Sequence, residues 1–282
     1  MVASALGLER FDFNLKNDEE IDSMKTILVK LGGELTDRFD EIDLIVRKIR
    51  DLKGKKYNVV MVHGGGAQIN EWSKKLGIPV KKMYGRRITD KDTLEVMQAV
   101  VAGLVNPNLV STLRSAGINA AGLTGADAGL TYSVRRPPLQ YGEETIDYGL
   151  IGEIEKVDTT YLNSLMANEI VPVISCLTWS REEGILNINA DTLACELAAR
   201  LEETELVLLS SVSGVWDKDN NIIAELSYQD WNVGVDEGWI TTGMQPKLEN
   251  GFKALKNGVN SVVITNPAGW NANKGTWLKN DQ

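Results

Sequence analysis

The chain has 282 residues, of which 43% are hydrophobic and 24% are charged, and its formal net charge is -9. This balance is typical of globular proteins and excludes wholesale disorder. The length allows one large domain or two lobes with a sizeable core. So acidic a chain is a poor general ligand for nucleic acid or anionic membranes, and an anionic substrate needs local basic groups.

The scarcity of histidine and cysteine restricts the chemistry further. His63 is the only imidazole, which excludes multi-histidine metal sites, and two cysteines are too few for a thiolate zinc site. Cys176 and Cys195 stand among apolar residues, which favours buried thiols in a reducing compartment. No apolar run approaches the roughly 18–20 residues of a membrane helix, and the N-terminus lacks a signal-peptide pattern. We therefore expect a soluble, cytoplasmic protein without a metal site of its own.

The first half of the chain alternates strand and helix patterns. After the weakly patterned residues 1–25, a β-type run over Thr26–Leu31 ends in a glycine pair, and a helical spacing follows over Glu34–Lys53. The same order repeats with a strand over Tyr57–Val62, three glycines and a helix over Ala67–Leu76. This order predicts a mostly parallel sheet with helices on its faces.

The rest of the chain continues the alternation. In the first half the patterns predict a hairpin over Lys81–Thr89, helices over Asp90–Leu104 and Asn108–Ser115, and a strand over Ile118–Leu123. Short antiparallel strands are predicted over 130–157, followed by a helix over Asp158–Asn168 and a strand over Val171–Cys176. In the second half they predict an extended segment over Ile185–Ile188, a helix over Ala190–Leu201 and a strand over Glu205–Leu209. A helix over Gly243–Asn257 and a last strand over Val259–Thr265 follow. Six of the seven tryptophans lie after residue 175, which favours a lobe boundary near Cys176.

Two glycine loops, Gly32–Gly33 and Gly64–Gly66, lie between predicted strands and helices. Glycine leaves backbone N–H groups uncovered, and a following helix adds the positive end of its dipole, so such loops suit anions. Neither loop is a GxxxxGK[ST] or GxGxxG motif, and turns also use glycine for positive φ. We interpret the two loops as sites for two anionic ligands, or for two anionic parts of a reacting pair.

Charged and polar residues stand close to these loops. Lys30 precedes the first glycine pair and would meet a ligand at the carboxyl edge of the sheet, although an edge lysine can also reach solvent. Lys247 lies in the first turn of a predicted helix, where the dipole disfavours a cation, so it indicates an anionic partner or is a surface lysine. Asn189 is a good helix cap before Asp191, but capping does not explain Asn187.

The clearest basic cluster is Arg86 and Arg87, beside two lysines in the predicted hairpin. One arginine of such a pair is suited to grip a carboxylate bidentately, whereas the other residues form a solvated face. His63 ends a predicted strand, and there a structural role is favoured over a catalytic one.

Seven segments together resemble the motifs of the amino acid kinase family. They are VKLGG (29–33), VHGGG (62–66), GRRITD (85–90), GLTGAD (122–127), LNINAD (186–191), LLSSVSGV (208–215) and GMQPK (243–247). The resemblance runs from about residue 27 to residue 278, and it implies an αβα sandwich around a largely parallel sheet with two lobes. It further implies an N-terminal arm over 1–25, an N-lobe over 26–176 for the acyl substrate and dimer contacts, and a C-lobe over 177–282 for ATP.

The resemblance also implies an activity: ATP-dependent phosphorylation of the γ-carboxylate of an N-acetylated glutamate in arginine biosynthesis, with Mg²⁺ bound through the nucleotide. By position, Lys30 and Lys247 match the lysines that stabilise the transferring phosphoryl group, and Asp191 matches the aspartate that holds these lysines in place. The residues that match substrate-binding positions are Gly65, Gly66, Arg87 and Asn187. The residues that match nucleotide-binding positions are Gly32, Gly33, Ser211, Gly214 and Lys247. The chemistry agrees, because an ionised carboxylate needs no general base and so no catalytic histidine.

Some features depart from the family pattern or leave alternatives open. Ser211 stands where the pattern LLTDVxGV has aspartate, and VHGGGA and GLTGAD are milder departures. The acyl group is acetyl or, alternatively, succinyl, whose extra carboxylate would need another cation such as Arg135 or Arg136. A further alternative is a non-catalytic, arginine-sensing relative. The resemblance implies a homodimer or a homohexamer.

Overall fold

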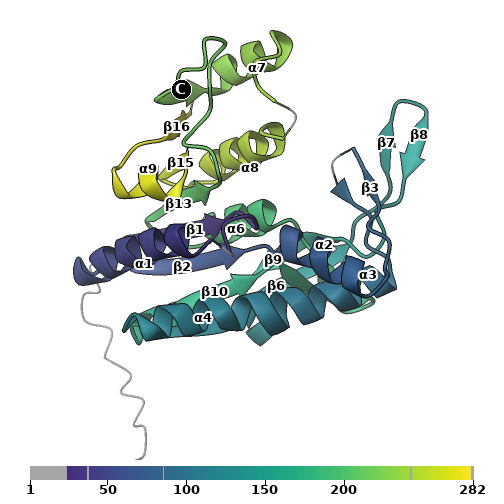
Figure 1. Cartoon of the computed structure of the whole chain (residues 1–282), viewed down its shortest axis with the longest axis horizontal. Helices are drawn as coiled ribbons and strands as arrows, with labels where there is room; N and C mark the ends of the chain where they lie inside the picture. The colour runs from purple at the N-terminus through teal and green to yellow at the C-terminus, as the bar shows by residue number, and fades with distance from the viewer. Residues whose placement is uncertain (1–23, 37, 85, 242, 281–282) are drawn as a thin grey trace, which may run out of the picture.

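The computed structural model describes residues 24–280 apart from positions 37, 85 and 242. The predicted N-terminal arm over 1–25 therefore lies outside the described residues, except for Met24 and Lys25. The described part confirms the predicted α/β class, with a central sheet and helices on both of its faces (Figure 1).

The central sheet has eight strands in the order β14-β16-β15-β13-β1-β2-β10-β5. Six neighbouring strands are parallel: β15 (Ser261–Thr265), β13 (Thr204–Leu209), β1 (Thr26–Leu31), β2 (Asn58–His63), β10 (Val171–Ser175) and β5 (Ala120–Thr124). Two strands at one edge, β16 (Thr276–Lys279) and β14 (Glu225–Ser227), run in the opposite direction. Every residue of β1 is buried, as expected for a central strand covered on both faces.

Alternate residues of β1 face different helices. Ile27 faces the side covered by α1 (Phe39–Gly54) and α9 (Pro267–Asn271), whereas Lys30 faces α6 (Ala190–Ala198). α8 (Gln245–Lys256) packs beside α6, and Gly251 of α8 approaches Leu208 and Leu278. Because strand side chains alternate between faces, this arrangement gives the predicted three-layer sandwich.

A smaller sheet has the strand order β12-β11-β6-β9 and includes strands of the first half of the chain. Its strands are β12 (Gly184–Asn187), β11 (Leu177–Ser180), β6 (Thr131–Arg135) and β9 (Gly152–Val157), with the short 3₁₀ helix Asp127–Gly129 before β6 and α5 (Thr160–Ala167) after β9. Residues 177–187 thus pair with strands of the first half. The functional division into lobes stays a prediction, and the strand pairing favours a boundary after β12 over one at residue 176.

The two helices predicted over Asp90–Leu104 and Asn108–Ser115 form one continuous helical stretch. It consists of α3 (Lys91–Met97), a π-helical segment η1 (Gln98–Val105) and α4 (Asn106–Ser115). The 25 residues from Lys91 to Ser115 are long and apolar enough to cross a membrane, so the expectation that no segment meets this criterion was wrong. Nearly half of the most apolar window, 44%, is buried, and its buried side chains join the main core as in a core helix of a globular protein.

Two hairpins project together from the first half of the chain (Figure 1). The predicted hairpin forms from β3 (Lys82–Met83) and β4 (Arg86–Arg87), and the second from β7 (Leu139–Tyr141) and β8 (Glu144–Ile146). The ring of Tyr84 stacks on that of Tyr141 with centroids 4.4 Å apart, which couples the hairpins.

The remaining differences from the predicted elements are local. The helix expected over Glu34–Lys53 begins only at Phe39, because residues 33–36 form a turn, whereas α2 (Gly66–Lys75) begins directly in its glycine loop. Elements that the patterns missed are short or lie at the sheet edge: β11, β14, α7 (Tyr228–Asp236), α9 and β16. Both cysteines are buried free thiols, as predicted.

Candidate active site

Two lysines from distant parts of the chain meet one carboxylate oxygen. Nζ of Lys30, on β1, lies 3.0 Å from Oδ1 of Asp191, and Nζ of Lys247, on α8, lies 3.1 Å from the same oxygen. The side chains are mostly buried, with exposed fractions of 9% for Lys30, 10% for Lys247 and 15% for Asp191. Each ammonium has three N–H donors and uses one on Asp191, so the pair can still bind an anion.

The start of α6 places the carboxylate between the two lysines. The side chain of Asn189 accepts hydrogen bonds from the backbone N–H groups of Asp191 (2.8 Å) and Thr192 (3.2 Å), which confirms the predicted cap. This cap holds Asp191 in the first turn, where the helix dipole favours negative charge.

The electrostatics of the trio favour an anionic ligand. Burial acts to raise the pKa of Asp191, but Lys247 and Lys30 outweigh it and hold that pKa well below its usual range. Burial, helped by Lys30, lowers the pKa of Lys247, whereas Asp191 outweighs burial at Lys30 and raises its pKa. Within the trio two cations share one carboxylate, so the trio by itself carries a net positive charge, which a bound phosphate would neutralise.

The two glycine loops come together beside this trio. A Cβ added to Gly33 would lie 2.8 Å from the backbone nitrogen of Gly66 and 3.4 Å from that of Gly65. The first loop is tied to the neighbouring strand by Gly32, whose N–H donates to the carbonyl of Leu209 at 3.1 Å. The loops therefore form one continuous site at the carboxyl edge of the sheet, where ligands bind in open α/β folds.

Glu34 is a site residue that the sequence reasoning missed. A Cβ added to Gly32 would lie 2.6 Å from Oε1 of Glu34, so the carboxylate is folded onto the first loop. The charge of Glu34 also acts to raise the pKa values of Lys30 and Lys247. An acidic residue directly after an anion-binding glycine pair was the available signal.

Arg87 lies next to the second glycine loop. Its Nη2 donates to Oδ1 of Asn70 at 2.6 Å and, more weakly, to the carbonyl of Gly66 at 3.5 Å. Its Nη1 is buried without a hydrogen-bond partner among the described residues, and burial lowers the pKa of the guanidinium. A buried donor without a partner is costly, so this geometry suits an anionic ligand.

The other predicted site residues differ in placement. Asn187 Nδ2 donates to Oγ1 of Thr89 at 3.0 Å, two residues beyond Arg87 in sequence. Gly214 is buried, and an added Cβ would lie 2.7 Å from Oγ1 of Thr276, so packing explains this glycine. Ser211 is exposed. The predicted nucleotide-side roles of Ser211 and Gly214 stay predictions.

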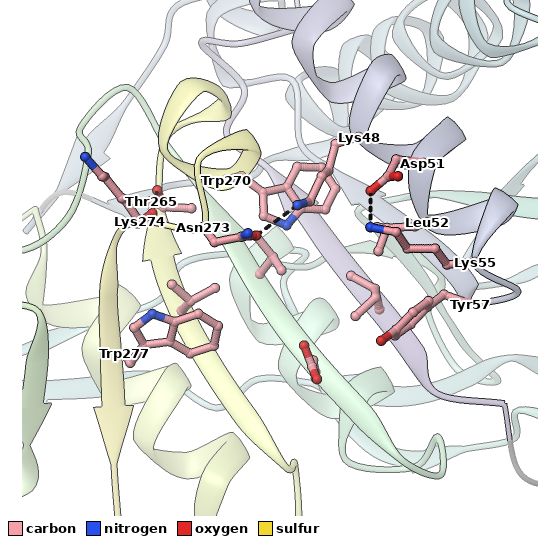
Figure 2. A pocket seen from close by; sticks show the side chains of 14 residues that line it. Lys48, Asp51, Leu52, Lys55, Tyr57, Thr265, Trp270, Asn273, Lys274 and Trp277 are labelled. Carbon is pink, nitrogen blue, oxygen red and sulfur yellow. Dashed lines mark hydrogen bonds and ion pairs between the residues drawn. The ribbon is translucent and has the colours of Figure 1, made fainter.

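A cavity of about 220 Å³ lies apart from this site, between α1, α9 and one face of the sheet (Figure 2). Its walls include Trp270, Trp277 and Tyr57, and no predicted site residue lines it. Figure 2 shows two of its three lysines in local contacts: Lys48 donates to Asn273 at 3.0 Å, and Lys55 pairs with the carboxylate of Asp51 at 2.9 Å.

The fold and the site together define a class, namely α/β proteins with a buried lysine pair and two glycine loops at the carboxyl edge of a parallel sheet. The chain belongs to the amino acid kinase family, whose model matches residues 25–266.

Relatives at moderate identity cover almost the whole chain. One from Bacteroides fragilis, named acetylglutamate kinase, is 37% identical over 261 residues, which are 90% of this chain and 97% of the relative. Another with that name, from Anaeromyxobacter sp., is 40% identical over 252 residues, with coverages of 87% and 93%.

Solved structures support the same fold. The structure of smu.665 from Streptococcus mutans has a TM-score of 0.77 at 28% identity and covers 90% of this chain and 98% of its own. A carbamate kinase from Giardia lamblia bound to AMP-PNP has a TM-score of 0.63 at 14% identity, with coverages of 92% and 99%, a likeness of fold alone.

Proposed function

We propose that this chain is an ATP-dependent kinase that phosphorylates the γ-carboxylate of N-acetyl-L-glutamate to give N-acetylglutamyl 5-phosphate in arginine biosynthesis. The names of the relatives support the substrate. The observation that carries the proposal is the convergence of Lys30 and Lys247 on Asp191 beside two joined glycine loops.

The residues of this site suit in-line phosphoryl transfer. A γ-carboxylate oxygen of the acceptor attacks the γ-phosphorus of ATP, the bond from that phosphorus to the β–γ bridging oxygen breaks, and ADP leaves. The acceptor is ionised at neutral pH and needs no base. Lys30 and Lys247 neutralise charge on the transferring group, and Asp191 keeps their ammonium groups together.

The acceptor side is assigned to Gly65, Gly66, Arg87 and Asn187. The free Nη1 of Arg87 binds the α-carboxylate of the substrate, and the N–H groups of the second loop bind the carboxylate to be phosphorylated. Gly32 and Gly33 face the nucleotide phosphates. We assign the first half of the chain to the acyl substrate and the second half to ATP, with a dimeric or hexameric assembly and a cytoplasmic location as further predictions.

Mg²⁺ fits this site as an ion that is bound through the phosphates of the nucleotide. Among the described residues, no group of three or more His, Cys, Asp or Glu side chains could hold a metal ion. When bound, the ion would take its ligands from the phosphates of ATP and from water, and it would neutralise phosphate charge.

A hydroxylamine trap tests the proposal. The purified chain is incubated with ATP, Mg²⁺, N-acetyl-L-glutamate and hydroxylamine, and the acyl hydroxamate is measured; Lys30→Met is the inactive control. We expect hydroxamate that depends on ATP and on the acyl substrate. Its absence with every acylglutamate would favour the non-catalytic, arginine-sensing alternative.

One observation favours keeping N-succinylglutamate as a second candidate substrate. Arg135 is occupied by Asp147 at 2.8 Å and Glu183 at 3.8 Å. Arg136 is half-buried without an ion pair among the described residues, and its pKa is lowered by burial and by Arg86. Such a cation suits the extra carboxylate of a succinyl group. If succinylglutamate is the substrate, Arg136→Gln will reduce kcat/KM for it more than for acetylglutamate; equal effects would exclude this role.

A further inference from the structure

We infer that His63 is a positioning residue. Its neutral ring holds the Gly64 carbonyl so that the second glycine loop presents its N–H groups to the acyl substrate. Asn106, which is placed by a π-helical turn, fixes the tautomer of the ring. This inference rests on the proposed role of that loop in binding the acceptor.

The hydrogen bonds of His63 define which ring nitrogen carries the proton. The ring is completely buried at the end of β2, with Nδ1 2.8 Å from the carbonyl oxygen of Gly64 and Nε2 2.9 Å from Nδ2 of Asn106. A carbonyl oxygen only accepts, so Nδ1 must carry hydrogen. An amide nitrogen only donates, so Nε2 must present its lone pair. Both bonds form only in the neutral Nδ1–H tautomer.

The orientation of the Asn106 amide follows from its other contacts. The same Nδ2 donates to the carbonyl of Val173 at 2.8 Å, and at 3.5 Å it faces the carbonyl of Leu123. A flipped amide would direct its oxygen at these acceptors, so the network determines which end of the amide faces His63. In protonated His63, the N–H at Nε2 would face the N–H donor of Asn106. Burial also lowers the pKa of His63 to about 4.

The direction of the Gly64 carbonyl controls the next N–H group. In a planar trans peptide, the C=O and the following N–H point in opposite directions. Because the Gly64 carbonyl turns toward the buried ring, the N–H of Gly65 turns away from it. A flip of this peptide would replace a donor in the loop with a carbonyl oxygen, which repels an anionic substrate.

The π-helical segment packs this arrangement from the other side. A Cβ added to Gly65 would lie 3.3 Å from Cγ2 of Val101 and 3.7 Å from Cγ2 of Val105, so the two valines border the space beside Gly65. Asn106 follows directly after the segment, and its side chain reaches His63. π-Helical turns are rare and often occur at functional sites, which agrees with this placement.

The single imidazole gives a direct test. In ¹⁵N-labelled protein, long-range ¹H–¹⁵N correlation spectra report one histidine, and we expect the Nδ1–H tautomer without titration from about pH 5.5 to 8.5. The Nε2–H tautomer, or titration near the ordinary pKa of histidine, would overturn the inference. This measurement needs no enzymatic activity, so it separates the inference from the proposed function.

A matched pair of variants tests the consequence for binding. Asn106→Ala removes the donor to His63, and Asn108→Ala changes an exposed residue of the same helix. We expect Asn106→Ala to raise KM for N-acetyl-L-glutamate about tenfold and KM for ATP less than about twofold, with Asn108→Ala affecting neither. Equal changes of both KM values, or none, would contradict a positioning role. If Asn106→Ala does not fold, the spectrum of the parent protein still decides.

Discussion

The two glycine loops follow neighbouring strands but differ in what lies behind them. Gly66 is the first residue of α2, and the Gly64 carbonyl is held by the ring of His63. After the first loop the chain makes a turn, in which the N–H of Leu35 donates to the Gly32 carbonyl at 3.0 Å, and the Glu34 carboxylate lies against Gly32.

On the proposed function, this difference predicts two modes of anion binding. The second loop has its backbone donors oriented by buried contacts, so it is preorganised for an acceptor carboxylate. The first loop has an acidic side chain on the surface that an anionic ligand must approach. We expect Glu34 to move when the nucleotide phosphates bind, so the first loop adapts while the second stays fixed.

The largest expected effect comes from separating the loops. In Gly33→Ala, the new Cβ would lie 2.8 Å from the Gly66 nitrogen, and a backbone atom cannot yield cheaply. A displacement of roughly 1 Å at a reacting site costs about 10²-fold in rate, so kcat/KM should fall at least that much while the protein stays folded.

Gly54→Ala is the matched control, because an added Cβ there meets nothing within 4 Å. Steady-state kinetics and circular dichroism of both variants provide the measurement. Parent-like turnover in Gly33→Ala would show that the two loops do not act as one site.

A second expected effect is an acid-dependent loss of stability that originates at the second loop. Burial lowers the pKa of His63 to about 4, below the ordinary value of 6.5. Between these values the unfolded chain binds a proton that the folded chain excludes, so stability rises with pH over this window and is complete above it.

Urea unfolding at several pH values measures this effect. From pH 7.5 to pH 5, this histidine should cost roughly 2 kcal/mol of unfolding free energy. His63→Leu removes the titrating group, so its own stability, although lower, should lose this component of the pH dependence. Identical pH slopes for the two proteins would contradict a neutral, buried His63.

The smallest expected effect concerns the first loop. Glu34→Gln keeps the size of the side chain but removes its charge from Gly32, so KM for ATP should fall about two- to threefold, the scale of an exposed charge pair. Glu202→Gln, an exposed surface change, is the control. A rise in KM for ATP would mean that the carboxylate assists nucleotide binding.

Local pattern predicted the parallel centre of the fold well. Thr26–Leu31 is a strand over the predicted residues, because a buried parallel strand reads as an apolar run that a glycine pair ends. Helix was predicted over most of the segment Gln98–Val105, but its π-helical form was not, and residues 105–107 with Pro107 were interpreted as a break between two helices. The edge strands β14 and β16 are short, and partner strands rather than local sequence determine them.

The site was only partly predictable. Lys30 stood out as a charge inside an apolar strand, but its approach to Asp191 and Lys247 depends on how α6 and α8 pack, which no local pattern contains; the family resemblance supplied that expectation. The position of Glu34 depends on the turn after Gly33, where a helix was expected to begin. The role of His63 required its partner Asn106, which is distant in sequence.

The central claim is that Lys30 and Lys247 act on the phosphoryl group in transfer. Its most direct test is the affinity for ADP with N-acetyl-L-glutamate, with and without aluminium fluoride, a mimic of that group. We predict that aluminium fluoride tightens ADP binding about tenfold or more in the parent, and that Lys30→Met and Lys247→Met each lose most of this gain. An undiminished gain in both variants would contradict the account.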